Sequence, residues 1–167
     1  MSAKSLLILG AGQFGIMVKE LALESGEYSR IDFLDDVAPF ALGKMCDCRK
    51  FATDYPNACV AIGDPTIRER LFSELYEAGF NLVNIIGRNT YISPSAVLGK
   101  GIIIEPMATV QKCARVGDGC IVSSGAVLRH DSCLEPFCHC DCNSVVMSNS
   151  TVPKGTKIPC LTVFKNN

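Results

Sequence analysis

The chain contains two histidines, His130 and His139, nine positions apart. Histidine is the side chain best suited to take a proton near neutral pH, for example from an amine or hydroxyl that attacks an ester. Asp131 follows His130 directly and could orient its imidazole and stabilise the charged form, as the acid of a catalytic triad does. By itself His130 could equally be an exposed histidine in a turn, so its setting decides between the two interpretations.

A second candidate for chemistry is the glycine-rich loop from Gly10 to Gly15, which reads Gly-Ala-Gly-Gln-Phe-Gly. It follows an apolar strand candidate, Ser5–Leu9, and precedes helical spacing over Ile16–Leu23, with Ile16 on the expected buried face. The next strand candidate, Ile31–Leu34, ends in Asp35 and Asp36. This order is typical of a dinucleotide-binding fingerprint, in which glycines let the backbone approach phosphates at a helix N-terminus. The alternative is a glycine turn required only for packing.

The following segments complete a small α/β domain. A third strand candidate, Ala58–Ile62, leads into Gly63 and Asp64, and helical spacing follows over Thr66–Ala78. In that helix Ile67 is expected in the apolar stripe and Arg68 on the solvent face. Asn81–Ile86 is a fourth strand candidate. The expected nucleotide-binding residues are Gly10, Gly12, Gln13, Phe14, Gly15, Asp35, Asp36, Gly63 and Asp64.

From Ile92 onward every sixth residue is aliphatic, with one cysteine in the series. The series is Ile92, Leu98, Ile104, Val110, Val116, Val122, Leu128, Leu134, Cys140, Val146, Val152 and Ile158. Four positions after each stands a residue that is small in all but one case: Ala96, Ile102, Ala108, Ala114, Cys120, Ala126, Ser132, Cys138, Ser144, Ser150, Thr156 and Thr162. Helices repeat at 3.6 and strands at 2, so a period of six indicates a chain that turns a corner every six residues.

These repeats predict a three-sided β-helix of about four coils, with the aliphatic residues inside and the small residues at the corners. A β-sandwich is the alternative, but sandwiches show no fixed period. We therefore expect two domains, a Rossmann-like nucleotide-sugar-binding domain over 1–88 and a hexapeptide-repeat β-helix over 89–167. The first is large enough for one mononucleotide and too small for a full dinucleotide fold.

Composition narrows the function classes. A net charge of −1 predicts no broad basic field for nucleic acid. No apolar run approaches the length of a membrane span, and Leu6–Leu9 is too short for the core of a signal peptide. We expect a cytoplasmic protein with no membrane contact.

Ten cysteines without a secretion signal argue against a disulfide framework. Cys120, Cys138 and Cys140 fall on inward positions and are expected to pack as small apolar residues. The run from Cys138 to Cys142 contains three cysteines and His139, but its C-x-C-x-C spacing differs from that of zinc sites, and we expect no metal.

The chain resembles the sialic acid O-acetyltransferase (NeuD-like) family, which includes UDP-sugar N-acetyltransferases of the PglD and PerB type. The resemblance rests on the glycine loop, on Phe33–Asp36, on Val60–Asp64 with Arg68, on Ile92–Ala96 and on Gly125–Asp131 followed by His139. It implies a left-handed β-helix, a homotrimer, acetyl-CoA as cosubstrate and a nucleotide-linked sugar as acceptor. It also implies that His130, supported by Asp131, is the general base. His139 is likewise expected to be catalytic, near the thioester carbonyl, and His139 and Ser148 are expected to bind the coenzyme.

The chain departs from the family at two points. Phe14 stands where the family loop often has a histidine, and only a short segment follows His139. The second departure keeps an alternative open, a non-catalytic trimer that binds a nucleotide-sugar or a partner. A γ-type carbonic anhydrase would need three histidine ligands, and a nicotinamide oxidoreductase would need a second mononucleotide-binding half. The sequence leaves open which sugar is acetylated, and whether on nitrogen or oxygen.

Overall fold

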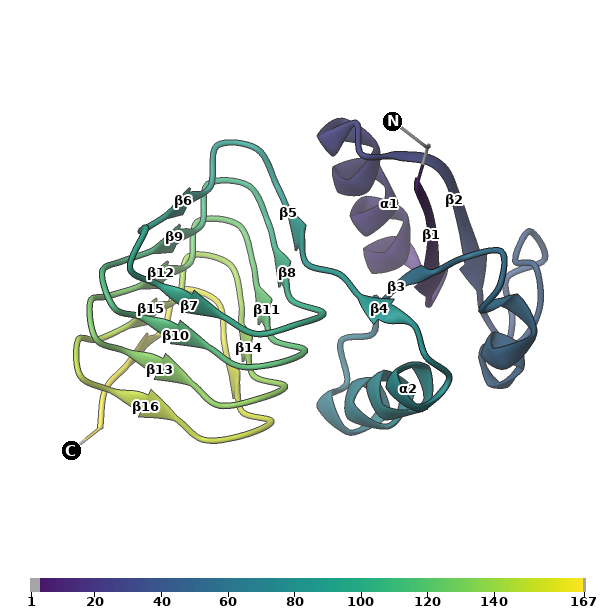
Figure 1. Cartoon of the computed structure of the whole chain (residues 1–167). Coiled ribbons are helices and arrows are strands. Elements are labelled where there is room, and N and C mark those ends of the chain that lie inside the picture. Colours follow the sequence, from purple (N-terminus) through teal and green to yellow (C-terminus); the bar gives the residue numbers. More distant parts are fainter. Residues whose placement is uncertain (1–3, 167) are drawn as a thin grey trace. The chain divides into compact units, whose positions relative to one another are not determined.

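The computed structural model describes residues 4–166 and divides into two compact units, Met1–Ile85 and Ile86–Asn167. The first unit is an α/β domain and the second is a solenoid of short strands (Figure 1).

The first unit is a four-stranded parallel sheet in the order β2-β1-β3-β4. Its strands are β1 (Lys4–Leu9), β2 (Tyr28–Leu34), β3 (Asn57–Val60) and β4 (Asn81–Leu82). Helix α1 (Gln13–Ser25) connects β1 to β2, and α2 (Pro65–Glu77) connects β3 to β4. A 3₁₀ helix, η1 (Met45–Phe51), which the sequence pattern did not predict, precedes β3.

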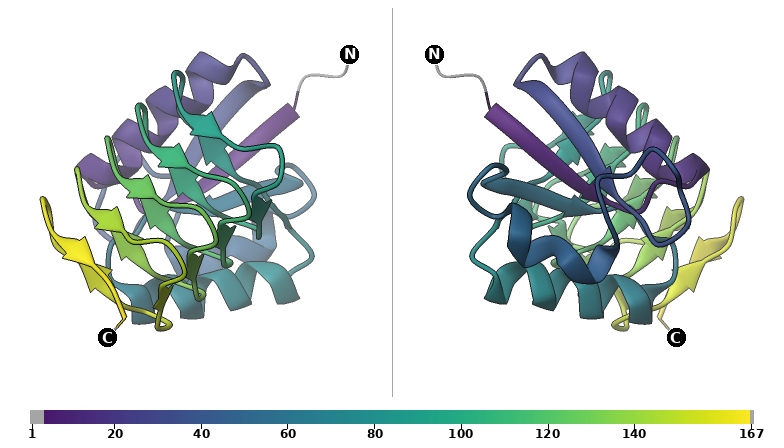
Figure 2. Two further views of the ribbon diagram at one scale, coloured as in Figure 1. Left: turned by 90° about the vertical axis from the view of Figure 1, so that its left-hand side faces the viewer. Right: turned by 90° about the vertical axis from the view of Figure 1, so that its right-hand side faces the viewer.

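The sheet lies between its two helices, as both views in Figure 2 show. Leu7 and Leu9 of β1 pack in one core with Leu71 and Leu75 of α2, and all four side chains are fully buried. Side chains alternate along a strand, so the neighbouring positions of β1 face α1, whose buried side includes Val18. Ile16 was expected on that buried side, but it is 37% exposed.

The predicted faces of α2 were wrong at two neighbouring positions. Ile67 is 41% exposed, whereas Arg68 is 1% exposed and is among the largest fully buried side chains. The guanidinium of Arg68 donates to the carbonyl oxygens of Ile62 and Gly63, at 2.8 Å each. These hydrogen bonds compensate for its burial and hold the turn after β3, so Arg68 belongs to the interior despite its charge.

The second unit is a left-handed parallel β-helix with sheets of four, five and five strands. Its strands are β5 (Ile85–Ile86), β6 (Tyr91–Ile92), β7 (Val97–Leu98), β8 (Ile103–Ile104), β9 (Thr109–Val110), β10 (Arg115–Val116), β11 (Ile121–Val122), β12 (Val127–Leu128), β13 (Cys133–Leu134), β14 (His139–Cys140), β15 (Val145–Val146), β16 (Thr151–Val152), β17 (Lys157–Ile158) and β18 (Val163–Phe164). These strands make four coils and part of a fifth.

Strands on one face pair in parallel with those one coil away, so each residue stacks on the residue eighteen positions later, as Arg115 does on Cys133. The predicted inward series forms the core: from Ile104 to Ile158 every member is at most 2% exposed. Burial of such side chains contributes about 1.5–3 kcal/mol each. Cys120, Cys138 and Cys140 are fully buried, as predicted, and burial raises the pKa of the Cys140 thiol to about 12.

Two expectations for the solenoid need correction. Asn81–Ile86 is not one strand, because β4 joins the α/β sheet whereas β5 pairs with β8 of the solenoid. The small residues are mostly buried, and the tight corner falls one position earlier, where the backbone is left-handed. These corner residues are Gly101, Met107, Cys113, Gly119, Gly125, Asp131, Phe137, Asn143, Asn149, Gly155 and Leu161. Left-handed backbone in a non-glycine residue costs about 1 kcal/mol, which stacking must offset.

Within residues 4–166, neither helix has the length and apolarity required to cross a bilayer.

The glycine loop supplies a test of this fold. A Cβ at Gly15 would collide with the carbonyl oxygen of Gly10, whereas a Cβ at Gly12 would meet no atom within 4 Å. Gly15→Ala should therefore lower the free energy of unfolding of the first unit by about 3 kcal/mol, because backbone cannot move aside as a side chain can. Urea unfolding followed by far-ultraviolet circular dichroism measures this. Gly12→Ala is the matched control, and equal stability of the two variants would contradict the account.

Candidate active site and nucleotide pocket

The glycine loop lies at the topological switch point of the sheet. The chain leaves β1 towards β2 on one side and later returns to β3 on the other, so β1 and β3 are neighbours whose connections diverge. In open α/β sheets, ligands bind outside the carboxyl ends of the strands at such a point. Gly10 follows β1 and Gly63 follows β3 closely, so the sequence-predicted glycines do flank this position.

The three glycines of the fingerprint differ in role. Gly10 has φ of +104°, and an added Cβ would lie 2.8 Å from the carbonyl oxygen of Ala61. Gly15 allows close approach of α1 to the loop, as described above. Gly12 is exposed at the N-cap of α1 with open space beside it. It is therefore the glycine placed to let a phosphate approach the helix N-terminus.

Asp35 organises this loop. One carboxylate oxygen accepts a hydrogen bond from the backbone N–H of Ala11 at 2.8 Å, and the other accepts from Val37 and Ala38. The bond from Ala11 is the main reason that the pKa of Asp35 lies below its usual range. Asp36 accepts from the backbone of Met45 at 3.0 Å. Both carboxylates thus accept hydrogen bonds from backbone N–H groups of nearby loops, a structural role that the sequence did not predict.

The segment after β3 is held in a similar way. Asp64 caps α2 by accepting from the backbone N–H of Ile67 at 2.9 Å, which satisfies one of the unpaired donors of the first turn. The carbonyl of Gly63 accepts from Arg68. Gln13 is exposed and Phe14 is half-buried at the start of α1.

His130 lines an open pocket of about 560 Å³ on the solenoid, together with Tyr91, Gln111 and Lys112. Its Nδ1 lies 2.9 Å from Oδ2 of Asp131, and its backbone N–H donates to Oε1 of Gln111 at 3.1 Å. Asp131 is a corner residue with φ of 59°, a conformation that aspartate tolerates better than most residues.

This contact favours one tautomer of the neutral ring of His130. A carboxylate can only accept, so Nδ1 carries the proton and Nε2 is the basic nitrogen. The same arrangement of acid, imidazole and free lone pair serves general bases in hydrolases.

Ser148 occupies the position of His130 in the following coil. Leu128 pairs with Val146, and His130 and Ser148 each come two residues after these paired residues. Its Oγ is buried and has no hydrogen-bond partner within the described part of the chain. Ser148 as a whole is half-buried, and it was one of the two residues that the resemblance assigned to the coenzyme.

His139 belongs to a buried polar chain across three coils. Nε2 of His139 lies 3.1 Å from Oγ of Ser123, and that hydroxyl lies 3.0 Å from Oε1 of Glu105. Glu105 is 8% exposed and also accepts from the backbone N–H and hydroxyl of Ser124. The buried carboxylate of Glu105 thereby accepts three hydrogen bonds from protein donors.

The direction of the chain follows from its terminal acceptor. Ser123 has one hydroxyl proton and must donate it to the carboxylate of Glu105. It can then only accept from His139, so Nε2 of His139 carries a proton and Nδ1 holds the lone pair of the neutral ring. Glu105 and Ser123 were not among the sequence-predicted residues. The only signal for them was their spacing, since positions 105 and 123 are one coil apart.

The two histidines lie on different faces of the solenoid. His130 follows β12 closely, whereas His139 lies in β14, and these strands are in different sheets. The side chain of His139 points away from the apolar core of the solenoid, because side chains alternate along a strand and that of Cys140 is buried in this core.

The polar chain predicts the tautomer of His139. Nitrogen–proton correlation spectra of the protein labelled in histidine should show the neutral ring protonated on Nε2. Ser123→Ala should abolish this preference because it removes the acceptor, whereas Ser150→Ala, another buried serine of the solenoid, should leave the spectrum unchanged. An Nδ1-protonated ring in the unaltered protein would refute the assignment.

Comparisons with known proteins agree with this architecture. Residues 5–75 match the family model of the PglD N-terminal domain. The structure is similar to the acetyltransferase domain of PglB from Neisseria gonorrhoeae, with a TM-score of 0.87 and 28% identity over 96% of this chain and 82% of that one. A structure of that domain with acetyl coenzyme A matches with a TM-score of 0.82 and 27% identity, over 97% and 93% of the two chains.

A third match is a histidine-to-asparagine variant of perosamine N-acetyltransferase from Caulobacter crescentus, in complex with CoA and GDP-perosamine. It has a TM-score of 0.70 and 20% identity, covers 92% of this chain and 90% of that one, and supports the fold alone. Residues 5–75 thus resemble the PglD N-terminal domain, and the chain as a whole shares its fold with the acetyltransferase domain of PglB and with perosamine N-acetyltransferase.

Proposed function

We propose that the protein transfers the acetyl group of acetyl-CoA to an amine or hydroxyl of a nucleotide-linked sugar. The observation that carries this proposal is the contact of Nδ1 of His130 with Asp131 in the lining of an open pocket, which leaves Nε2 as a base. The structural relatives that are acetyltransferases, one with acetyl coenzyme A, support the reaction class.

In this reaction the acceptor nitrogen or oxygen attacks the thioester carbonyl carbon. Nε2 of His130 removes the proton of the acceptor, while Asp131 stabilises the imidazolium that forms. Collapse of the tetrahedral intermediate breaks the carbon–sulfur bond, and the proton then passes to the departing CoA thiolate. The cation of Lys112 in the pocket lining suits anionic substrates.

His139 takes a different part. Its Nε2 proton is directed to Ser123, and the buried Nδ1 of the neutral ring carries no proton to donate. We therefore propose that the ring of His139 contacts the coenzyme without donating a hydrogen bond to the thioester oxygen. The half-buried Ser148 is a second candidate contact for the coenzyme, as the sequence resemblance implies.

The proposal includes a homotrimer with the site between chains. Within one solenoid the two histidines lie on different faces, so one substrate could reach both only where the face of one chain meets that of another. The nucleotide would bind in the N-terminal unit, with its phosphates at Gly12 and the start of α1. The sequence resemblance favours uridine, and the GDP-perosamine of one relative makes guanosine a second candidate.

The first test concerns the base. His130→Ala should lower the rate of acetyl transfer by about 10²–10⁴-fold, because it removes the proton acceptor. CoA release with a panel of UDP- and GDP-linked amino sugars measures this rate. Glu20→Ala, on the exposed side of α1, is the control. Unchanged activity in His130→Ala would remove the basis of the mechanism, and sugar binding without any transfer by the unaltered protein would favour the non-catalytic alternative.

Assembly of the site is tested by mixing chains. Light scattering should give about three times the 18.0 kDa of one chain. Refolded mixtures of His130→Ala and His139→Ala chains should regain part of the activity that each variant lacks, because some interfaces then hold both native histidines. A dilution-stable monomer, or mixtures no more active than the separate variants, would rule out a site shared between chains.

The nucleotide site is tested at Gly12. Gly12→Val should abolish calorimetrically detectable binding of UDP- and GDP-sugars, because the side chain would occupy the open space beside the helix N-terminus. Gly12→Ala establishes that the loop still folds. Full binding by the valine variant would reduce this loop to a packing turn.

A further inference from the structure

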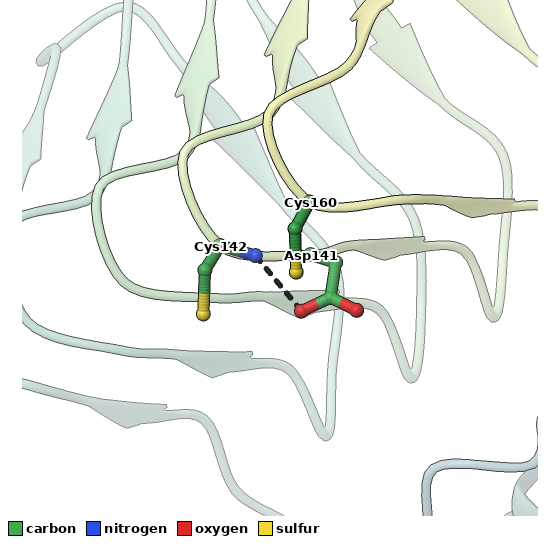
Figure 3. Close-up of side chains that lie close together, drawn as sticks. All are labelled: Asp141, Cys142 and Cys160. Carbon is green, nitrogen blue, oxygen red and sulfur yellow. Dashed lines mark hydrogen bonds between the residues drawn. The ribbon is translucent and has the colours of Figure 1, made fainter.

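A second group of reactive side chains lies on the solenoid, apart from His130 and its pocket. It consists of Asp141 and Cys142, directly after β14, and Cys160, two residues after β17 (Figure 3). A carboxylate oxygen and the two sulfur atoms all lie within 4.8 Å of one another. All cysteines of the chain are free thiols.

The stacking of the coils brings this group together. Strand β14 pairs with β17, so His139 stacks on Lys157, and Cys142 stacks on Cys160 one coil later. The backbone N–H of Leu161 donates to the carbonyl of Cys142 at 3.0 Å, which fixes the two corners against each other. The sulfurs are therefore neighbours through backbone pairing.

We propose that Asp141, Cys142 and Cys160 bind a thiophilic divalent cation, with zinc as the best fit. Zinc takes sulfur at about 2.3 Å and carboxylate oxygen at about 2.0–2.2 Å, in tetrahedral geometry. Two sulfur ligands in that geometry lie about 3.8 Å apart, which the observed spacing accommodates. Two thiolates select against magnesium and calcium, which prefer oxygen ligands. Three protein ligands leave the fourth position to water.

The surroundings suit such an ion. Oδ1 of Asp141 accepts from the backbone N–H of Cys142 at 2.9 Å, and Oδ2 lies 3.0 Å from the ammonium of Lys157. These contacts orient the carboxylate, as outer partners do in metal sites. The negative charges of two thiolates and one carboxylate would be balanced by the ion together with Lys157. Asp141 and Cys142 are half-buried and Cys160 is exposed, so an ion can enter from solvent.

This site differs from the one that the run of cysteines at 138–142 suggests. Cys138 and Cys140 are fully buried in the core, and His139 is directed to Ser123. Asp141 and Cys142 are the residues of that run that take part, and the third residue of the group, Cys160, lies outside the run.

The test uses the full chain without a histidine tag, kept reduced with a phosphine. Titration with Co²⁺ should give thiolate-to-metal charge-transfer and tetrahedral d–d absorption that saturates at one ion per chain, and Zn²⁺ should displace it. Cys160→Ser and Cys142→Ser should each weaken binding by at least about tenfold. Cys46→Ser, which alters an exposed thiol of the other unit, should bind as the unaltered protein does.

A second readout separates ligation from misfolding. Saturating Zn²⁺ should raise the melting temperature of the unaltered chain and of Cys46→Ser by about 5 °C, because the ion joins two successive coils. The two ligand variants should show native circular dichroism and no such rise. Absence of thiolate bands, or equal Co²⁺ affinity in Cys160→Ser and Cys46→Ser, would overturn the proposal.

Discussion

Backbone pairing between coils is the constraint on which the solenoid depends. Each strand is only two residues long and could not exist alone, so its hydrogen bonds must go to the coils above and below. The eighteen-residue stack that results arranges side chains in columns. One column sets Glu105 beside Ser123, another sets His130 beside Ser148, and a third sets Cys142 beside Cys160.

The N-terminal unit depends on a different constraint, the divergence of connections at β1 and β3. Its polar side chains form hydrogen bonds that hold the loops after β1 and β3 in place. Asp35 fixes the glycine loop through Ala11, and the buried Arg68 fixes the turn after β3. Rigid loops at strand ends are what phosphate recognition by backbone N–H groups requires, because the donors must already converge.

The sequence revealed most of the fold because its periods are strict. The six-residue series places the core correctly from Ile104 to Ile158, and the glycine fingerprint places β1 and α1. The sequence pattern gave a wrong prediction where a charged residue is buried. Arg68 reads as a solvent residue, and only the carbonyls of Ile62 and Gly63 in three dimensions explain its burial. The corner was also misplaced by one residue, since Met107, Phe137 and Leu161 give no sign of left-handed backbone.

The residues of the candidate site could be read from the sequence only in part. The motif Gly125–Asp131 and the nearby His139 indicated His130, Asp131 and His139, because these residues lie close together in the sequence. The partners Ser123 and Glu105 lie sixteen and thirty-four positions before His139, so no local motif indicates them, and only the pairing of coils brings the three together. Cys160 escaped notice for the same reason, although Cys142 did not.

The stacked register also constrains how such a chain can change in length. Gain or loss of a whole coil of eighteen residues leaves every remaining column intact, since the new neighbours meet in the same register. Gain of a single residue within a strand would turn inward positions outward from that point to the next corner. A duplication between Ser123 and His139 would keep the core continuous and yet separate the histidine from its hydroxyl. We therefore expect this unit to tolerate insertions and deletions only as whole coils. An inserted coil that separates two residues in hydrogen-bond contact would change the site even where the solenoid still folds.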